Sequence, residues 1–165
     1  MTIDDLRVLL DYHYWARDRM LTAVDALTLD QYARDMGSSF RSIRDTVVHI
    51  YAAEWAWYSR WQSQSPTALL DAGRFPDVPS IRSAWTELET KVRDFTERIG
   101  RDGLDRVIEY KLLGGQPGSS PFWQMLQHVV NHASYHRGQV TTMLRQMGAA
   151  APKPMDLIAF YRTRG

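Results

Sequence analysis

The sequence contains no cysteine and no long apolar run. Without cysteine the chain cannot form disulfide bridges, thiolate metal ligands or a cysteine nucleophile, so any thiol chemistry needs a thiol from outside. No stretch approaches the roughly 20 uninterrupted apolar residues that span a bilayer. The N-terminus carries acidic residues early and lacks the basic and apolar segments of a signal peptide. We therefore expect a cytoplasmic protein with no membrane partner.

An excess of charge of either sign is also missing. The chain has 20 Lys and Arg against 19 Asp and Glu, a net charge of +1. Nucleic-acid-binding domains usually concentrate a strong basic excess on one face, so this balance predicts no nucleic-acid partner. The length of 165 residues and the 44% hydrophobic composition are typical of one globular domain, which we expect to cover residues 1–165.

The sequence does contain long segments with helical spacing of apolar residues. Four of them cover, in approximate bounds, residues 2–26, 39–62, 80–100 and 120–148. These segments predict an all-α protein, a four-helix bundle with at least one long crossover.

Local signals predict how three of these helices begin. Thr2, with Asp5 three residues later, predicts a capping box. We expect Ser80 to cap the third helix, and Pro121 to occupy the first helical position of the fourth after Ser120.

The connecting segments differ in kind. Residues 29–37 form a short link typical of antiparallel neighbours, and the Pro- and Gly-containing residues 64–79 could cross one end of the bundle. Residues 106–118 alternate briefly and then turn, which predicts a short β-ribbon. We expect residues 152–165 to pack against the outside of the bundle through Ile158, Phe160 and Tyr161.

Three of the five histidines lie on the fourth predicted helix, at His128, His132 and His136. Histidines four residues apart lie about 40° apart on a helical wheel, so neighbouring imidazoles can converge on one ion. His136 lies about 40° from the centre of the apolar face, His132 about 80° and His128 about 120°. The wheel therefore directs His132 and His136 toward the interior and His128 toward the flank.

A third ligand would have to come from a facing helix, and His49 is the candidate. His49 lies off the bulky stripe of the second helix, on a side shared with the small residues Ala53 and Ala56. One histidine facing a pair on another helix is a bundle-core type of metal site. The spacing alone leaves two interpretations open, a metal site and histidines that are merely packed; we interpret His13 as an ordinary core or surface residue.

These segments resemble the DinB/YfiT-like family. The resemblance rests on HVVNHASYHRGQV at residues 128–140 continuing to residue 148, and on SIRDTVVH at residues 42–49 with Glu54 and Trp57 behind it. Residues 14–16 and 156–162 fit as well, so the match spans nearly the whole chain.

The resemblance implies a four-helix bundle of up-down-down-up topology with a three-histidine metal site. Carried over residue by residue, the ligands fall on His49, His132 and His136. The resemblance further implies nickel or zinc as the metal, a homodimer and, in some relatives, a low-molecular-weight thiol such as mycothiol or bacillithiol. The family name refers to induction by DNA damage and implies no DNA contact.

Three imidazoles without a thiolate suit zinc, nickel, iron or copper and leave a coordination position for water or substrate. We therefore expect a divalent-metal-binding protein that acts as a metal-dependent enzyme, a thiol-dependent S-transferase or related hydrolase on a small-molecule substrate. A non-catalytic metal-binding or stress-response protein is the alternative, and a structural helical dimer with packed histidines is a third interpretation.

Three further side chains are candidates for roles around the site. Gln139 lies about 20° from His132 on the wheel and could orient a ligand or touch a substrate, although a solvated glutamine fits the pattern equally. Glu54 and Arg137 lie on apolar faces, and a buried charge needs a partner. We expect each to be paired, either with the other or with a different residue, in a structural ion pair away from the metal.

Overall fold

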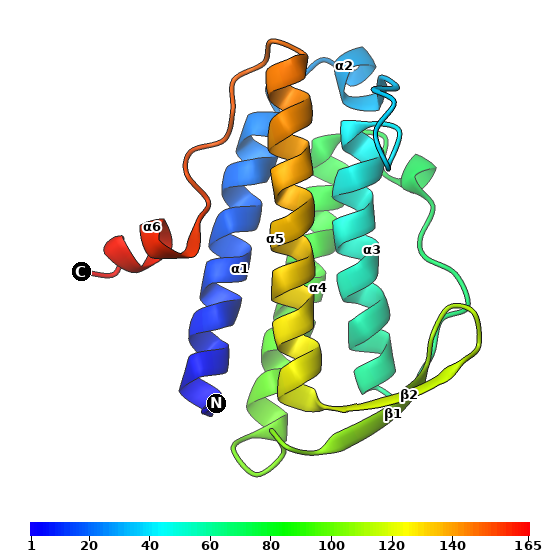
Figure 1. Ribbon diagram of the computed structural model, residues 1–165, viewed down its shortest axis with the longest axis vertical. Helices are drawn as coiled ribbons and strands as arrows, with labels where there is room; N and C mark the ends of the chain where they lie inside the picture. Colours follow the sequence, from blue (N-terminus) through cyan, green and yellow to red (C-terminus); the bar gives the residue numbers. More distant parts are fainter.

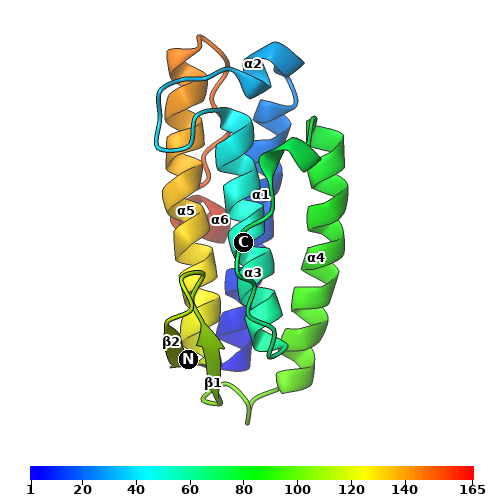
Figure 2. The same cartoon turned by 90° about the vertical axis from the view of Figure 1, so that its right-hand side faces the viewer.

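The computed structural model describes all residues 1–165 and is mostly helical. Its four long helices are α1 (Ile3–Val24), α3 (Ile43–Trp61), α4 (Val78–Ile99) and α5 (Phe122–Gln146). Figures 1 and 2 show α1 and α5 running in one direction and α3 and α4 in the other, with a long crossover between α3 and α4. The predicted all-α bundle is confirmed, and the helix directions follow the order that the family resemblance implies.

The shorter elements lie at the ends and on the outside of the bundle (Figure 1). They are α2 (Leu29–Ala33), the 3-10 helix η1 (Ala72–Arg74), β1 (Val107–Lys111), β2 (Pro117–Pro121) and α6 (Leu157–Arg162). β1 and β2 pair antiparallel, with Val107 opposite Pro121 and Lys111 opposite Pro117, as expected for the predicted ribbon. The helix α2 was not predicted, because its five residues are too few for a periodic pattern.

The capping box at the start of α1 is confirmed, since Thr2 and Asp5 exchange hydrogen bonds. Two other predicted starts are wrong. The cap of α4 is Asp77, whose carboxylate accepts the N–H of Ser80 at 2.9 Å, so Ser80 is already inside the helix. Pro121 ends β2 with an extended backbone instead of opening α5, because strand pairing with β1 continues up to that residue.

The second predicted helix also begins later than expected. Ser42 caps α3 by accepting the N–H of Asp45, and residues 34–42 form an irregular loop instead of a first helical turn. This correction matters for the site, because Phe40 lies in that loop.

The core fills the space between the four long helices with large apolar side chains. Trp85, Phe122, Met20, Ile50 and Leu126 are almost completely buried. None of the helices is both long and apolar enough to cross a membrane.

The C-terminal segment follows the prediction only in part. Phe160 is buried against Tyr12 and Trp15, with ring centroids 5.7 and 5.4 Å away. Ile158 and Tyr161 remain exposed, because the short helix α6 can direct only one side of its surface toward α1.

Candidate metal centre

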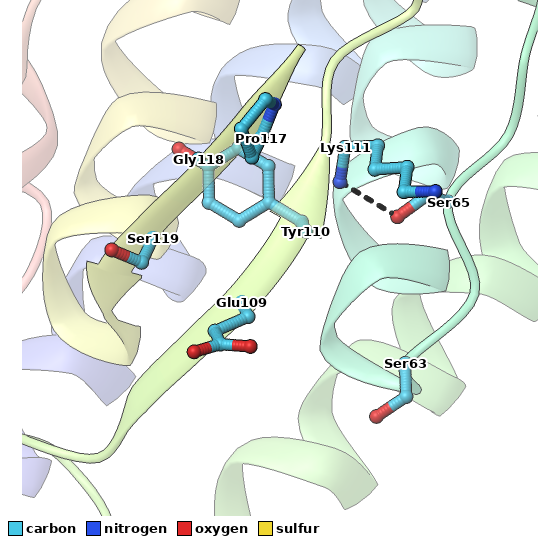
Figure 3. Close-up of a pocket in the computed structure, with 8 residues that line it drawn as sticks. All are labelled: Ser63, Ser65, Glu109, Tyr110, Lys111, Pro117, Gly118 and Ser119. Atoms are coloured by element: carbon cyan, nitrogen blue, oxygen red, sulfur yellow. Dashed lines mark hydrogen bonds between the residues drawn. The ribbon is translucent and has the colours of Figure 1, made fainter. Parts of the chain in front are cut away.

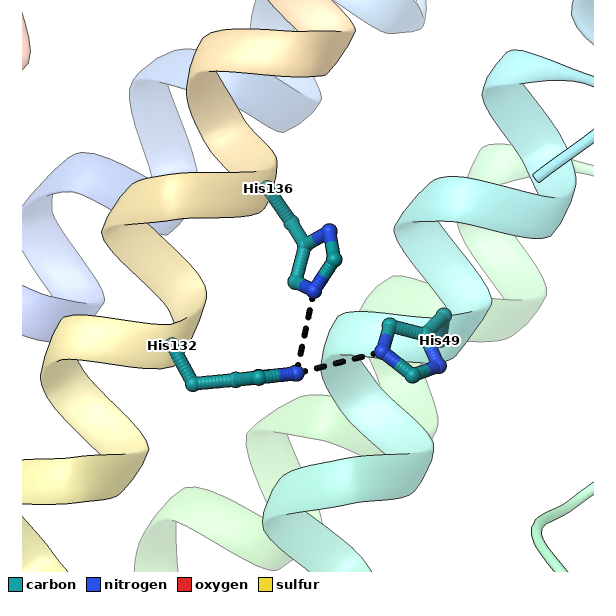
Figure 4. A group of neighbouring side chains, drawn as sticks. All are labelled: His49, His132 and His136. Atoms are coloured by element: carbon teal, nitrogen blue, oxygen red, sulfur yellow. Dashed lines mark hydrogen bonds between the residues drawn. The ribbon is translucent and has the colours of Figure 1, made fainter. Parts of the chain in front are cut away.

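His49, His132 and His136 come together between α3 and α5 (Figure 4). The Nε2 atom of His132 lies 3.1 Å from Nε2 of His49 and 3.0 Å from Nε2 of His136. One ligand nitrogen from each ring lies within 4.8 Å of the other two. These are the three histidines that the helical wheel and the family resemblance select; their role as metal ligands stays a prediction.

The helix geometry explains why the rings meet. His132 and His136 are one turn apart on α5, so their side chains leave the same face of the helix. α3 lies beside α5 in both views of the bundle, and His49 extends from it into the space between them (Figures 1, 2 and 4). Ala53 follows one turn later on α3, and its small side chain leaves room next to the imidazoles.

The contacts between the rings do not form a satisfied hydrogen-bond network. A neutral imidazole nitrogen has either one hydrogen or one lone pair, so it makes one good hydrogen bond. Nε2 of His132 nevertheless faces two other nitrogens at hydrogen-bond distance. Nitrogens that bind one tetrahedral zinc at 2.0–2.1 Å lie about 3.3 Å from each other, so the observed spacing fits a shared cation.

The electrostatics of the cluster keep the rings of His49 and His132 neutral, as metal ligation requires. Burial, together with the neighbouring His136, lowers the pKa of His49 from 6.5 to about 4. Burial and then the neighbouring histidines lower the pKa of His132 to about 3. At neutral pH both rings therefore offer a lone pair and carry no proton that would compete with a cation.

Gln139 orients one of the rings. Its Oε1 accepts a hydrogen bond from Nδ1 of His136 at 2.7 Å, which leaves the lone pair of that ring on Nε2, facing the cluster. Metal-binding histidines commonly have such a partner on the other ring nitrogen. Of the two roles considered for Gln139, the structure shows the contact that orients a ring.

Phe40 covers one side of the cluster, and sequence reasoning missed it. Its ring stacks on His49 with the centroids 4.0 Å apart and presents an edge to His136 at 5.4 Å. The predicted helix over residues 39–62 would have placed Phe40 in a regular first turn. An aromatic residue a few positions before a helix cap gives no signal that it folds back over a polar site.

The two remaining histidines lie outside the cluster. His128 is exposed on α5, one turn before His132, as the wheel indicates. His13 on α1 is completely buried, and its Nε2 bonds to Glu54 at 2.9 Å. His13 is thus a core residue, although its Nδ1 has no hydrogen-bond partner.

Glu54 and Arg137 do not pair with one another. The Glu54 carboxylate accepts hydrogen bonds from Tyr14 and Trp85 in addition to His13. Burial alone would raise the pKa of Glu54, but His13 and the donated hydrogen bonds outweigh it, so the pKa lies below its ordinary value.

Arg137 has no carboxylate partner at all, which contradicts the expected ion pair. Its guanidinium donates to the hydroxyl groups of Tyr12 and Ser134 at 3.3 and 2.7 Å. Glu54 faces α1 and α4 while Arg137 faces α1 from α5, so the two charged groups never meet.

Two hollows lie near the ends of the bundle. The first, of about 690 Å³, lies between the β1–β2 ribbon and residues 63–65, and no histidine lines it (Figure 3). The second, of about 510 Å³, is lined by Gln139, Tyr135 and the loop residues Met36 to Ser38. Because Gln139 also bonds to His136, the second hollow adjoins the histidine cluster.

Comparisons with known proteins agree with the fold. The family model described as "DinB family" matches residues 2–163. The chain is 25% identical over 158 residues to Protein DinB of Bacillus subtilis (strain 168), an alignment that covers 92% of each chain. A crystal structure of a DinB-like protein from Bacillus cereus superposes with a TM-score of 0.68 at 19% identity, covering 88% of this chain and 95% of the other.

Proposed function

Because this chain belongs to the DinB family, we propose that it binds a divalent metal ion through His49, His132 and His136. The observation that carries this proposal is the convergence of three imidazole nitrogens, one of which faces both others. Three imidazoles without thiolate suit zinc, nickel, iron or copper, and the family resemblance favours nickel or zinc among these.

We further propose that the site belongs to a metal-dependent enzyme, a thiol-dependent S-transferase or a related hydrolase. An ion with three protein ligands supplies Lewis acidity at its open coordination position. The chain itself supplies the geometry, since Gln139 holds the ring of His136 and Phe40 shields one face of His49. Because the chain has no cysteine, a thiol substrate must come from outside, and the hollow beside Gln139 offers space for a small molecule.

The metal proposal is tested by elemental analysis of protein purified without an affinity tag. We expect about one ion per chain in the wild type and almost complete loss in His132→Ala. His128→Ala is the matched control, because it removes an imidazole from the same helix outside the cluster and should keep the ion. Equal metal content in His132→Ala and the wild type would contradict the assignment.

The catalytic proposal is tested separately on metal-loaded protein. Low-molecular-weight bacterial thiols are offered with a panel of electrophilic substrates, and consumption of the thiol is followed. Turnover that disappears in His132→Ala supports an enzyme. No turnover with fully loaded protein would refute the catalytic proposal and favour a protein that binds metal without catalysis.

A further inference from the structure

Arg60 is a buried cation without an acidic partner. It lies near the end of α3 with 5% of its surface exposed. Its Nε donates to the carbonyl oxygen of Lys111 at 3.2 Å, and no carboxylate lies within ion-pair distance. The similarly buried Arg17, by contrast, pairs with both Asp18 and Glu89.

The free donors of Arg60 are not sealed inside the core. Neither of its Nη groups makes a hydrogen bond within the protein, and neither is among the fully enclosed polar atoms. The guanidinium carbon lies 4.5 Å from the ring centroid of Trp57 and 5.6 Å from that of Tyr110, so aromatic rings flank it. A guanidinium with five N–H donors and one protein acceptor can still bind a planar or tetrahedral anion.

A row of rings connects Arg60 with the histidine cluster. The centroid of Trp57 lies 5.2 Å from that of His128, which lies 5.8 Å from that of His132. Trp57 contacts both the guanidinium of Arg60 and the ring of His128, so these two groups lie on either side of one indole. Burial lowers the pKa of His128, and the charge of Arg60 lowers it further. Arg60 therefore presents its free N–H donors at the far end of the row, and His128 lies between Trp57 and the cluster.

The helix geometry places this row along the seam between α3 and α5. His49, Ala53, Trp57 and Arg60 fall within about 80° of one another around α3, while His128 and His132 share one face of α5. The small side chain of Ala53 lies between the cluster and Trp57, so no bulky residue of α3 fills that stretch.

We infer that Arg60, with His128 beside it, forms an anion-binding subsite of the metal centre. It takes the carboxylate or phosphate end of an elongated small-molecule substrate whose reacting group lies at the three histidines. The inference rests on the proposed function of that cluster, and it narrows the substrate class to anionic molecules.

The helix also sets the length of such a substrate. His49 and Arg60 are separated by 11 residues, or about 16 Å along the axis at 1.5 Å per residue. Helical side chains lean toward the N-terminus, and the long side chain of Arg60 leans further than that of His49. The distance from the guanidinium to the cluster is therefore about 10 to 12 Å.

The first experiment uses the cobalt-loaded full chain and straight-chain thiols that end in either a carboxylate or a hydroxyl group. Binding of the sulfur is followed through the thiolate-to-cobalt absorption band. We expect the carboxylate to bind about tenfold more tightly than the alcohol of equal length, because it gains a charge-assisted hydrogen bond. The preference should be greatest at roughly 7 to 9 methylenes, the length that spans the estimated distance.

Matched variants identify the residue responsible. Arg60→Gln should abolish the carboxylate preference while the alcohols still bind, and Arg60→Lys should keep part of it. Arg98→Gln, on the exposed side of α4, removes the same charge elsewhere and should keep the full preference. A preference that is absent in the wild type at every length, or that survives Arg60→Gln, would overturn the inference.

A second measurement needs neither metal nor variant. The Nε–H resonance of Arg60 is followed by NMR in the metal-free wild type while inorganic phosphate or acetate is added, and a saturable shift with either anion supports the subsite. The anion that binds more tightly shows whether phosphate or carboxylate is preferred, and no shift with either overturns the inference. Failure of every thiol to bind the cobalt protein, with a positive NMR result, would instead count against the proposed function.

Discussion

Replacing Glu54 should destabilise the protein strongly without affecting the metal centre. Its carboxylate accepts hydrogen bonds from Nε2 of His13 at 2.9 Å, the hydroxyl of Tyr14 at 2.7 Å and Nε1 of Trp85 at 2.6 Å. Glu54 itself is 2% exposed, so water cannot take its place. The side chain thus joins α1, α3 and α4, and it contacts none of the three clustered histidines.

The magnitude follows from the groups left behind. Each buried donor that loses its acceptor costs about 1 to 3 kcal/mol, and removing one partner of a buried charged pair typically costs 3 to 5 kcal/mol. We expect Glu54→Ala to lower the free energy of unfolding by about 4 kcal/mol and Tm by about 10 °C. Glu54→Gln keeps the shape and one acceptor but presents an amide N–H₂ to the donors, so it should cost about half as much.

The assay is urea denaturation followed by circular dichroism, together with calorimetry. Glu97→Gln is the matched control, because Glu97 is an exposed acid paired with Arg7 on the surface and its loss should leave stability nearly unchanged. Metal content should remain about one ion per chain in folded Glu54→Gln. A loss below about 1 kcal/mol for Glu54→Ala would refute the view that this buried network holds three helices together.

Three further predictions concern the histidine cluster. Gln139→Leu should weaken metal binding about 10- to 100-fold in a chelator competition, because the ring of His136 loses its orienting acceptor. Gln139→Glu keeps an acceptor and should retain the metal affinity. Equal affinity in the wild type and both variants would contradict the orienting role of Gln139. Folding lowers the pKa of His49 to about 4 and that of His132 to about 3, so near pH 5 the unfolded chain binds protons that the folded chain does not. The free energy of unfolding of the metal-free protein should therefore be lower at pH 5 than at pH 7. Urea titrations that agree at both pH values would contradict this. Phe40→Ala should speed removal of the metal by a chelator without changing its stoichiometry, since it uncovers one face of His49; an unchanged removal rate would show that Phe40 does not shield the site.

The candidate site shows where reasoning from sequence succeeds. The spacing of His132 and His136 and their position on the apolar face depend only on helix periodicity, which the sequence displays directly. His49 could be selected because it lies beside alanines on a helix with a bulky stripe on another side. Phe40 could not be selected, because its contact with His49 depends on the path of an irregular loop.

The charged residues show where such reasoning fails. The sequence places both Glu54 and Arg137 on apolar faces, which correctly predicts that they are buried. To choose their partners, one must know how each helix is rotated about its own axis. A small difference in that rotation decides whether the two residues form an ion pair with each other or belong to two separate hydrogen-bond networks. Glu54 therefore bonds to His13, a residue interpreted as unremarkable, and Arg137 bonds to two hydroxyl groups.

The sequence by itself determined the all-α class, the four long helices, the ribbon and the lack of any thiol in the chain. Those properties follow from local periodicity, turn chemistry and composition, each of which is present in a short stretch of residues. Only the tertiary structure decided that three imidazole nitrogens meet, that Phe40 covers one side of them and that Arg60 packs on Trp57 without an acidic partner. These are distances between residues far apart in the chain, and they are set by how whole helices pack against one another.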